Sequence, residues 1–176
     1  MAGLGGARRS PAIVPFEASH ATAVLDVIGA VFREYAMTFD PSGFDADLTD
    51  IRRSYLERGG RFWVLVDDGR VVGTVAVVPT GRVACEIKRL YLLPGYRGRG
   101  LGRALMEQPL GWATASGYRQ IVAWSDARLT TAHGVYERMG FGRFGERTVE
   151  DADRSREYGF RKELAPSSTI VPPRLE

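Results

Sequence analysis

The chain has few cysteines and histidines, the residues that disulfide bonds and many metal sites require. It contains one cysteine, Cys85, and two histidines, His20 and His133. A single thiol cannot form an internal disulfide bond, which favours a reducing compartment, and so few sulfur and imidazole ligands argue against a zinc site. We therefore expect a cytoplasmic protein that holds no metal, with Cys85 as a buried bystander in a strand.

Long hydrophobic runs and clustered charge are also absent. No apolar stretch approaches the roughly 18 residues that a membrane-spanning helix requires. Arg8 and Arg9 are not followed by the apolar segment of a signal peptide. The formal net charge is +3, and the arginines are spread along the chain. We therefore expect neither a membrane nor a nucleic acid as partner, while the mild positive charge suits an anionic, phosphate-bearing ligand.

The length fits one domain. A chain of 176 residues can bury a normal hydrophobic core without additional cross-links. Residues 1–10 are rich in Gly, Ala and Arg, and residues 165–176 contain three prolines with little periodicity. We predict flexible tails at 1–10 and 165–176, and a single domain over 11–164.

Hydrophobic periodicity predicts an alternating α/β order in this domain. The expected strands are 13–16, 62–66, 71–78, 83–93, 120–125, 144–149 and 156–162, and the expected helices are about 20–35, 45–58, 100–116 and 130–139. Ser19 is a plausible N-cap for the first helix, Pro109 should bend the third, and Asp68-Gly69 suits a type I′ hairpin turn. This order predicts a mixed α/β sheet of about seven strands flanked by about four helices.

A glycine-rich segment, residues 96–103, follows one strand and opens a helix. The free N–H groups at a helix start bind phosphate, and glycines let the backbone approach such a ligand. Arg97, Arg99 and Arg103 add attraction for an anion. The position of the third glycine of a dinucleotide-binding loop is occupied by Arg103, and the Gly-Lys-Ser/Thr of a Walker loop is absent. Two alternatives remain: another kind of pyrophosphate site, or a turn whose arginines are merely solvated.

Three sequence blocks resemble one family. Arg97-x-x-Gly100-x-Gly102 resembles the (Gln/Arg)-x-x-Gly-x-(Gly/Ala) signature of the GNAT superfamily of N-acetyltransferases. Residues 90–94, Leu-Tyr-Leu-Leu-Pro, resemble the strand and proline before that loop, and residues 135–141 resemble the closing Tyr-Glu-Lys-Leu-Gly-Phe block. The resemblance covers about residues 11–164. Within the family, the sequence is similar to uncharacterised bacterial members. The resemblance implies the GNAT fold, a mostly antiparallel sheet with a splayed parallel pair in the middle.

The resemblance also implies a co-substrate, acetyl-CoA, and no metal. The backbone of Leu90, Tyr91 and Leu92 would pair with the pantetheine arm, as an added strand does. The pyrophosphate would be held by the loop, which comprises Arg97, Gly98, Arg99, Gly100, Leu101, Gly102 and Arg103. The acetyl group would pass directly to a primary amine of a small molecule or peptide while both substrates are bound. The alternative is a non-catalytic acyl-CoA-binding sensor, and the family also implies that a homodimer can form.

The resemblance suggests catalytic groups as well. Tyr136 matches the family's tyrosine, five residues before Phe141, and would protonate the departing thiolate; the alternative is a buried core tyrosine. Glu86 lies eleven residues before Arg97, at the spacing of a glutamate base in part of the family. Strand alternation would place Glu86, Lys88 and Leu90 on one face, so Glu86 and Lys88 could equally form a plain ion pair.

Further polar residues follow the fifth predicted strand. Asp126 ends that strand and would bind or deprotonate the amine, or else serve as a turn carboxylate. His133 lies one helical turn before Tyr136 and is either a helper or a surface residue. One departure from the family is Leu129, which stands where many relatives carry a CoA-contacting Asn; Thr130 or Thr131 would replace it. The acceptor candidates between the first two helices are Glu34, Tyr35, Phe39 and Asp40.

Overall fold

The computed structural model describes residues 10–165, so the predicted tails lie outside it except for Ser10 and Ala165. One seven-stranded sheet forms the centre, in the order β1-β2-β3-β4-β5-β7-β6. Its strands are β1 (Ala12–Pro15), β2 (Arg61–Asp67), β3 (Arg70–Pro79), β4 (Ala84–Leu92), β5 (Gln120–Asp126), β6 (Gly142–Thr148) and β7 (Arg156–Glu163). Every neighbouring pair is antiparallel except β4 and β5, which are parallel. The predicted mixed sheet is therefore confirmed.

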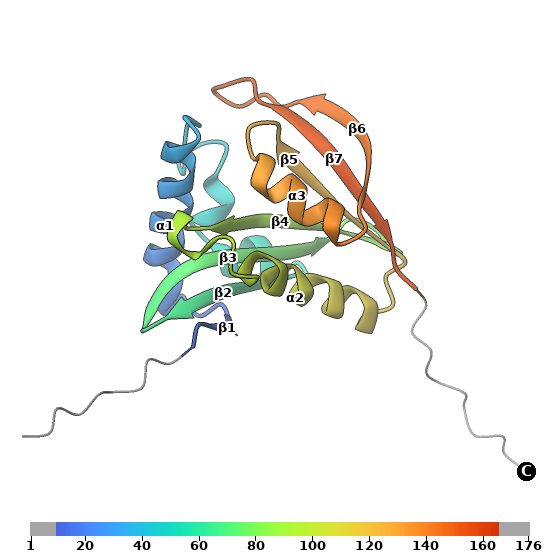
Figure 1. Cartoon of the computed structure of the whole chain (residues 1–176), viewed down its shortest axis with the longest axis horizontal. Helices are drawn as coiled ribbons and strands as arrows, with labels where there is room; N and C mark the ends of the chain where they lie inside the picture. Colours follow the sequence, from blue (N-terminus) through green and yellow to red (C-terminus); the bar gives the residue numbers. More distant parts are fainter. Residues whose placement is uncertain (1–9, 166–176) are drawn as a thin grey trace, which may run out of the picture.

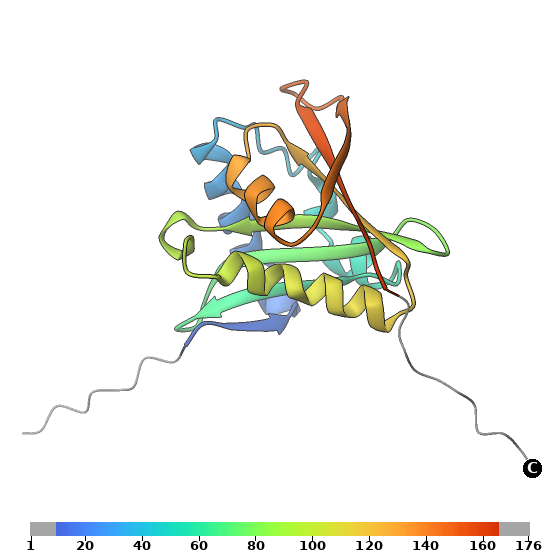
Figure 2. The same ribbon diagram turned by 45° about the vertical axis from the view of Figure 1, so that its right-hand side comes forward.

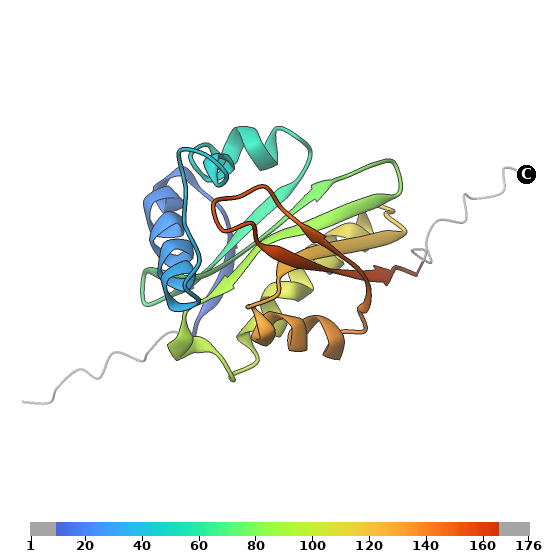
Figure 3. The same ribbon diagram turned by 90° about the horizontal axis from the view of Figure 1, so that it is seen from above.

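Helices cover both faces of the sheet. One face carries α1 (Ala21–Glu34) with the short segments η2 (Ala46–Leu48) and η3 (Arg52–Leu56), and the other carries α2 (Leu101–Ala115) and α3 (Thr130–Arg138) (Figure 1). Seen from above, the two groups lie on opposite sides of the strands (Figure 3), and α2 crosses the front of the sheet in Figure 2. Two hydrophobic clusters match the two faces, one centred on Leu105 and Ile121, the other on Ile28 and Phe62.

Two local helix predictions need correction. Ser19 does not cap α1, because it lies inside a 3-10 turn, η1 (Ala18–His20), whose capping box is formed by Glu17 and His20. The helix expected over 45–58 is divided into a 3-10 turn, η2, and a π-helical turn, η3. The Asp45 and Asp47 carboxylates of this region bind Arg89 on β4, so tertiary ion pairs shape the segment rather than helical periodicity.

Other local predictions hold. Asp68 and Gly69 have φ of 48° and 76°, as a type I′ turn requires. Gly140 ends α3 with φ of 82°. That Pro109 bends this helix stays a prediction; α2 continues on both sides of the buried Pro109.

A bulge in β4 gives the centre of the sheet its shape. Ala76 pairs with Lys88 and Thr74 with Tyr91, so Arg89 and Leu90 both lie opposite the single residue Val75. Arg89 has φ of 57°, a left-handed conformation that residues with a Cβ rarely adopt. The extra residue reverses the alternation. Leu90 therefore packs with the α2 and α3 cluster, and the prediction that it shares a face with Glu86 and Lys88 is wrong.

The parallel pair separates beyond the bulge. The pairing of β4 with β5 runs from Ala84 opposite Gln120 to Ile87 opposite Ala123. Among the described residues, Tyr91 and Leu92 of β4 pair only with β3 and Leu90 lies in the bulge, so the edge of 90–92 that faces β5 is unpaired. This free edge faces the starts of α2 and α3 and positions the site described next.

Candidate active site

A cavity of about 380 Å³ lies between the free edge of β4 and the helices α2 and α3. We call it the loop cavity. The residues that line it are Val31, Tyr35, Leu90, Tyr91, Leu92, Arg97, Gly98, Gly100, Gly102, Arg103, Leu129, Thr131, Ala132, Val135, Arg138 and Met139. It is mostly apolar along the strand, and its glycines and arginines gather at the start of α2.

A smaller cavity of about 140 Å³ opens on the face that carries α1. We call it the acidic cavity, because its lining includes six carboxylates against three cationic side chains. The charged lining residues are Asp45, Glu86, Lys88, Arg89, Asp126, Arg147, Asp151, Asp153 and Glu157. Leu90, Tyr91 and Leu129 line both cavities, so the two meet where β4 and β5 separate.

The glycine loop has the geometry of an anion site. Gly98 and Gly100 have φ of 72° and 77°, so any side chain there would be strained. Gly100 is the N-cap of α2, and no side chain caps the helix. The N–H groups of the first turn are therefore available to a ligand beside the positive end of the helix dipole.

The structure places most of the predicted cofactor residues on the loop cavity. Those that line it are Leu90, Tyr91, Leu92, Arg97, Gly98, Gly100, Gly102 and Arg103. Arg99 and Leu101 do not line it. The Arg99 guanidinium lies 5.6 Å from the centre of the Tyr96 ring. The Leu101 side chain packs against the hydrophobic core.

Arg97 is occupied by protein partners. Its guanidinium binds both Glu34 oxygens, at 2.6 and 2.8 Å, and its Nε donates to the Leu92 carbonyl at 2.9 Å. The hydrogen bonds to Glu34 raise the pKa of Arg97 above its usual value. Its charge is thus compensated, and Arg97 joins the end of α1 to the end of β4 instead of attracting an anion from afar.

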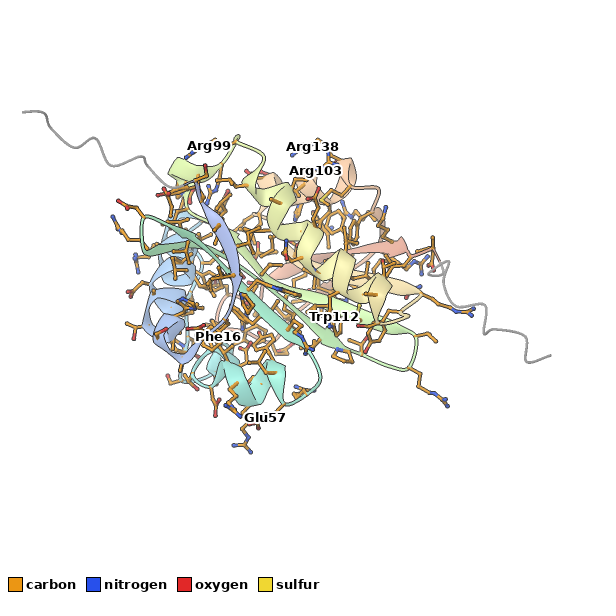
Figure 4. The ribbon with its side chains drawn as sticks, turned by 90° about the horizontal axis from the view of Figure 1, so that it is seen from below. Phe16, Glu57, Arg99, Arg103, Trp112 and Arg138 are labelled. Atoms are coloured by element: carbon orange, nitrogen blue, oxygen red, sulfur yellow. The ribbon has the colours of Figure 1, made fainter. Side chains whose placement is uncertain are left out.

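Sequence reasoning missed a third arginine at this cavity, besides Arg97 and Arg103. Arg138, on α3, lines it opposite Arg103, and Figure 4 shows the two side chains near each other at the start of α2. The Arg138 guanidinium folds over Gly134, where an added Cβ would lie 2.9 Å from Nη1. The i, i+4 spacing of a glycine and an arginine on one helix face was the available signal.

Tyr136 reaches the junction from below the sheet. Its side chain is buried, packs between Phe141 and Phe160, and lines the acidic cavity although α3 lies on the opposite face. Burial, with smaller contributions from Tyr91 and Glu157, raises the pKa of Tyr136 well above its usual value, which keeps the hydroxyl protonated.

Glu86 lines the acidic cavity but forms an ion pair with Lys88. Its carboxylate lies 3.1 Å from the Lys88 ammonium, so the alternative of an ion pair is realised. The Lys88 side chain is 40% exposed and that of Glu86 is 16% exposed. Such a half-exposed pair is weak, so an incoming ammonium could replace Lys88 at the carboxylate.

Asp126 is bound more firmly. Its two carboxylate oxygens accept hydrogen bonds from Arg128 Nε at 2.9 Å and Nη2 at 2.7 Å, and the Arg128 N–H adds a third at 2.8 Å. Burial alone would raise the pKa of Asp126, but the bonds from Arg128 outweigh it and lower the pKa. A carboxylate held this way is a poor base and matches the alternative of a turn carboxylate.

His133 and the four acceptor candidates lie outside the lining of the acidic cavity. His133 lines neither cavity; its Nε2 lies 3.0 Å from the Asp126 carbonyl, and its ring stacks near Phe160. Of the four acceptor candidates, none lines the acidic cavity. Glu34 and Tyr35 belong to the Arg97 contacts, Phe39 packs on Phe32, and Asp40 binds within its own loop. The acidic cavity uses Met37, Thr38 and Phe44 from that region instead.

The CoA-facing position of the family's asparagine is apolar here. Leu129 fills it and lines both cavities, and Thr131 rather than Thr130 reaches the loop cavity. Among residues 10–165, no group of three or more His, Cys, Asp or Glu side chains is arranged to hold a metal ion. No helix in this range is long and apolar enough to cross a membrane.

Comparison with solved structures supports this fold. An acetyltransferase of the GNAT family from Staphylococcus aureus Mu50 superposes with a TM-score of 0.80 at 19% identity, covering 89% of this chain and 100% of that one. A GNAT superfamily phosphinothricin acetyltransferase from Sinorhizobium meliloti, solved in complex with AcCoA, superposes with a TM-score of 0.70 at 20% identity. That pair covers 95% of this chain and 98% of the other.

Sequence comparison identifies the family. Rat N-acetyltransferase family 8 member 2 is 37% identical over 62% of this chain, which spans half of that relative's length. The uncharacterised N-acetyltransferase YjgM of Escherichia coli (strain K12) is 33% identical over 68% of this chain and 74% of its own. The model of the acetyltransferase (GNAT) family matches residues 28–141. The chain therefore belongs to the GNAT family of acetyltransferases and is an acyltransferase enzyme.

Proposed function

We propose that residues 11–164 form a catalytic domain that transfers the acetyl group of acetyl-CoA to a primary amine. The observation that carries this proposal is the meeting of the two cavities at Leu90, Tyr91 and Leu129, beside Tyr136. A thioester entering from the loop cavity and an amine entering from the acidic cavity would meet there, so both substrates bind before the acetyl group moves.

The loop cavity fits acetyl-CoA. The uncapped start of α2 and the glycines with positive φ offer backbone N–H groups to the pyrophosphate. Arg138 and Arg103 supply charge beside it, since the ion pair of Arg103 with Glu107 is exposed and weak, whereas that of Arg97 with Glu34 is more buried. The unpaired edge of residues 90–92 offers hydrogen bonds to the pantetheine arm, and the apolar wall from Val135 and Met139 covers its carbon chain.

Acetyl transfer requires a proton for the departing thiolate. Tyr136 supplies it in this proposal, because burial keeps its hydroxyl protonated and its side chain lines the acidic cavity, which meets the loop cavity at Leu90, Tyr91 and Leu129. The new thiol then leaves through the loop cavity. In this proposal, N–H groups on the unpaired edge of β4 stabilise the negative charge that forms on the carbonyl oxygen.

The amine must also lose a proton before it attacks. Glu86 is the carboxylate we assign to this step, directly or through water, since its weak pairing with Lys88 leaves it able to accept. Asp126 is excluded from this step by its three bonds from Arg128. The excess of carboxylates over cations in the acidic cavity favours acceptors that arrive as ammonium ions.

A panel of amines tests the proposal. CoA release with acetyl-CoA should be measured against free amino acids, polyamines, aminoglycosides and peptides with free N-termini, with acetyl-CoA affinity measured in parallel by calorimetry. Turnover of at least one class, with initial rates that show both substrates bound together, is the expected result. Binding of acetyl-CoA without turnover of any amine would favour the alternative, a non-catalytic acyl-CoA sensor.

A further inference from the structure

Arg128 forms hydrogen bonds with three separate parts of the chain. It lies in the connection between β5 and α3, and its Nε and Nη2 grip Asp126 at 2.9 and 2.7 Å. Its Nη1 donates to the Ala36 carbonyl at 3.1 Å, just after α1. Its Nη2 also reaches Ser155 Oγ at 3.0 Å and Asp153 Oδ2 at 3.3 Å, in the turn between β6 and β7.

Asp153 completes the link between these parts. It accepts hydrogen bonds from the Thr38 N–H at 2.9 Å and the Thr38 hydroxyl at 2.7 Å. Thr38 and Asp153 are 115 positions apart in the sequence, so these bonds connect two distant segments, residues 36–38 and 151–155. One guanidinium and one carboxylate therefore join the segment after α1 to the turn between β6 and β7.

These joined segments are two rims of the acidic cavity. Met37 and Thr38 line it from one side, and Asp151, Asp153 and Ser155 line it from the other. Each rim contains a residue other than glycine in the left-handed conformation, Ala36 with φ of 51° and Arg154 with φ of 50°. Such conformations persist only where surrounding contacts impose them, and they concentrate at functional sites.

We propose that Arg128 is a positioning residue that fixes the width of the acceptor cavity and so determines which amines bind. The proposal rests on the proposed function, since it takes the acidic cavity as the acceptor site. In this view Asp126 acts through Arg128: it orients the guanidinium, whose remaining donors hold Ala36, Asp153 and Ser155 in place. The effect should reach the acceptor and not acetyl-CoA, because the Arg128 partners Asp126, Asp153 and Ser155 line the acidic cavity and not the loop cavity.

The planar fork of an arginine is essential to this role. Lysine carries the same charge but is a point donor, which cannot grip Asp126 with two bonds and still span to both rims. Arg128→Lys should therefore raise the KM for the acceptor roughly tenfold or more, which corresponds to the loss of one charge-assisted hydrogen bond. The KM for acetyl-CoA should stay within about twofold, and kcat should change less than the acceptor KM.

The experiment measures steady-state kinetics of the full chain with the best amine from the panel. Arg52→Lys is the matched control, because Arg52 forms an exposed ion pair with Glu57 and lines neither cavity. Thr38→Val is the second variant, since it removes the hydroxyl bond that joins the rims, leaves the charge of the acidic cavity unchanged and keeps the bidentate pair of Arg128 with Asp126. It should shift the acceptor KM in the same direction and by a smaller factor.

The outcomes separate this proposal from the function it rests on. Unchanged acceptor KM in both variants overturns the positioning role while leaving the acetyltransferase intact. An equal loss for acetyl-CoA and acceptor also overturns it, because that result marks general destabilisation. If Arg128→Lys does not fold, the Thr38→Val result decides. If the wild type acetylates no amine, the proposed function itself fails, and the positioning role fails with it.

Discussion

The hydroxyl of Thr74, on β3, donates a 2.7 Å hydrogen bond to the carbonyl oxygen of Arg89, at the bulge of β4. Thr74 is fully buried. Its hydroxyl therefore gives the Arg89 carbonyl a hydrogen-bond donor inside the protein, in place of the strand partner that the bulge removes. The Arg89 side chain is fixed separately, by Asp45 and Asp47. Backbone and side chain together hold the conformation that lets β4 separate from β5.

Thr74→Val tests this bond. Valine keeps the shape but leaves the Arg89 carbonyl without its donor, so we expect unfolding free energy to fall by about 1–3 kcal/mol. Urea denaturation measures it. Thr148→Val, at an exposed strand position, is the control and should change stability little. Equal stability of Thr74→Val and wild type would show that the bulge does not need the hydroxyl.

Acid stability should reflect the pair of Asp126 and Arg128. The folded-state pKa of Asp126 is lowered, so its contribution is fully present above the unfolded value of about 3.9 and is lost as pH falls through the folded pKa. In Asp126→Asn the stability should be lower at neutral pH, and its decline below about pH 4 should be shallower. Denaturation midpoints measured from pH 7 to pH 2 check this, and parallel curves for the two proteins would contradict it.

Replacing Tyr136 by Phe should separate chemistry from binding. We expect kcat to fall by roughly 10²- to 10⁴-fold, the usual contribution of a general acid, with acetyl-CoA affinity unchanged. Because burial raises the pKa of Tyr136, its ionisation should cause no loss of activity as pH rises to about 10. Tyr118→Phe is the control, since Tyr118 packs on Trp112 and lines neither cavity. Full activity in Tyr136→Phe would remove its assigned role.

Cys85 should resist thiol reagents in the folded protein. Its side chain is fully buried, and burial raises the pKa of the thiol to about 12, so almost no thiolate exists at neutral pH. Iodoacetamide should modify it only in denaturant. Rapid labelling in native buffer, followed by mass spectrometry, would show that the strand opens or that the thiol is exposed.

Local sequence signals predicted most of the fold. Alternating apolar residues, the Asp-Gly turn and the glycines before α2 each act within a few residues of the chain, and the strands appeared where they indicated. The bulge could not be predicted this way. Arg89 adopts positive φ because Asp45 and Asp47, more than 40 positions earlier, bind its side chain.

In the candidate site, too, local features were predictable from the sequence and distant contacts were not. The loop residues were predictable because one continuous segment forms them, whereas the partners of that segment were not. Arg97 is neutralised by Glu34, which is 63 positions away, and the rim at 151–155 meets Thr38 across 115 positions. Periodicity carries no information about such contacts, so the sequence named Glu34, Tyr35, Phe39 and Asp40 as acceptor candidates and did not indicate the neighbouring Met37, Thr38 and Phe44, which line the acidic cavity.

Binding of acetyl-CoA to the start of α2 is the central claim, and titration calorimetry of three proteins tests it most directly. The wild type should bind one acetyl-CoA, and Gly100→Val should bind it at least about tenfold more weakly, because φ of 77° at this position is strained for a β-branched residue. Gly111→Ala, in open space on the same helix, should bind like the wild type. No heat of binding in the wild type, or equal affinity in all three proteins, would contradict the claim.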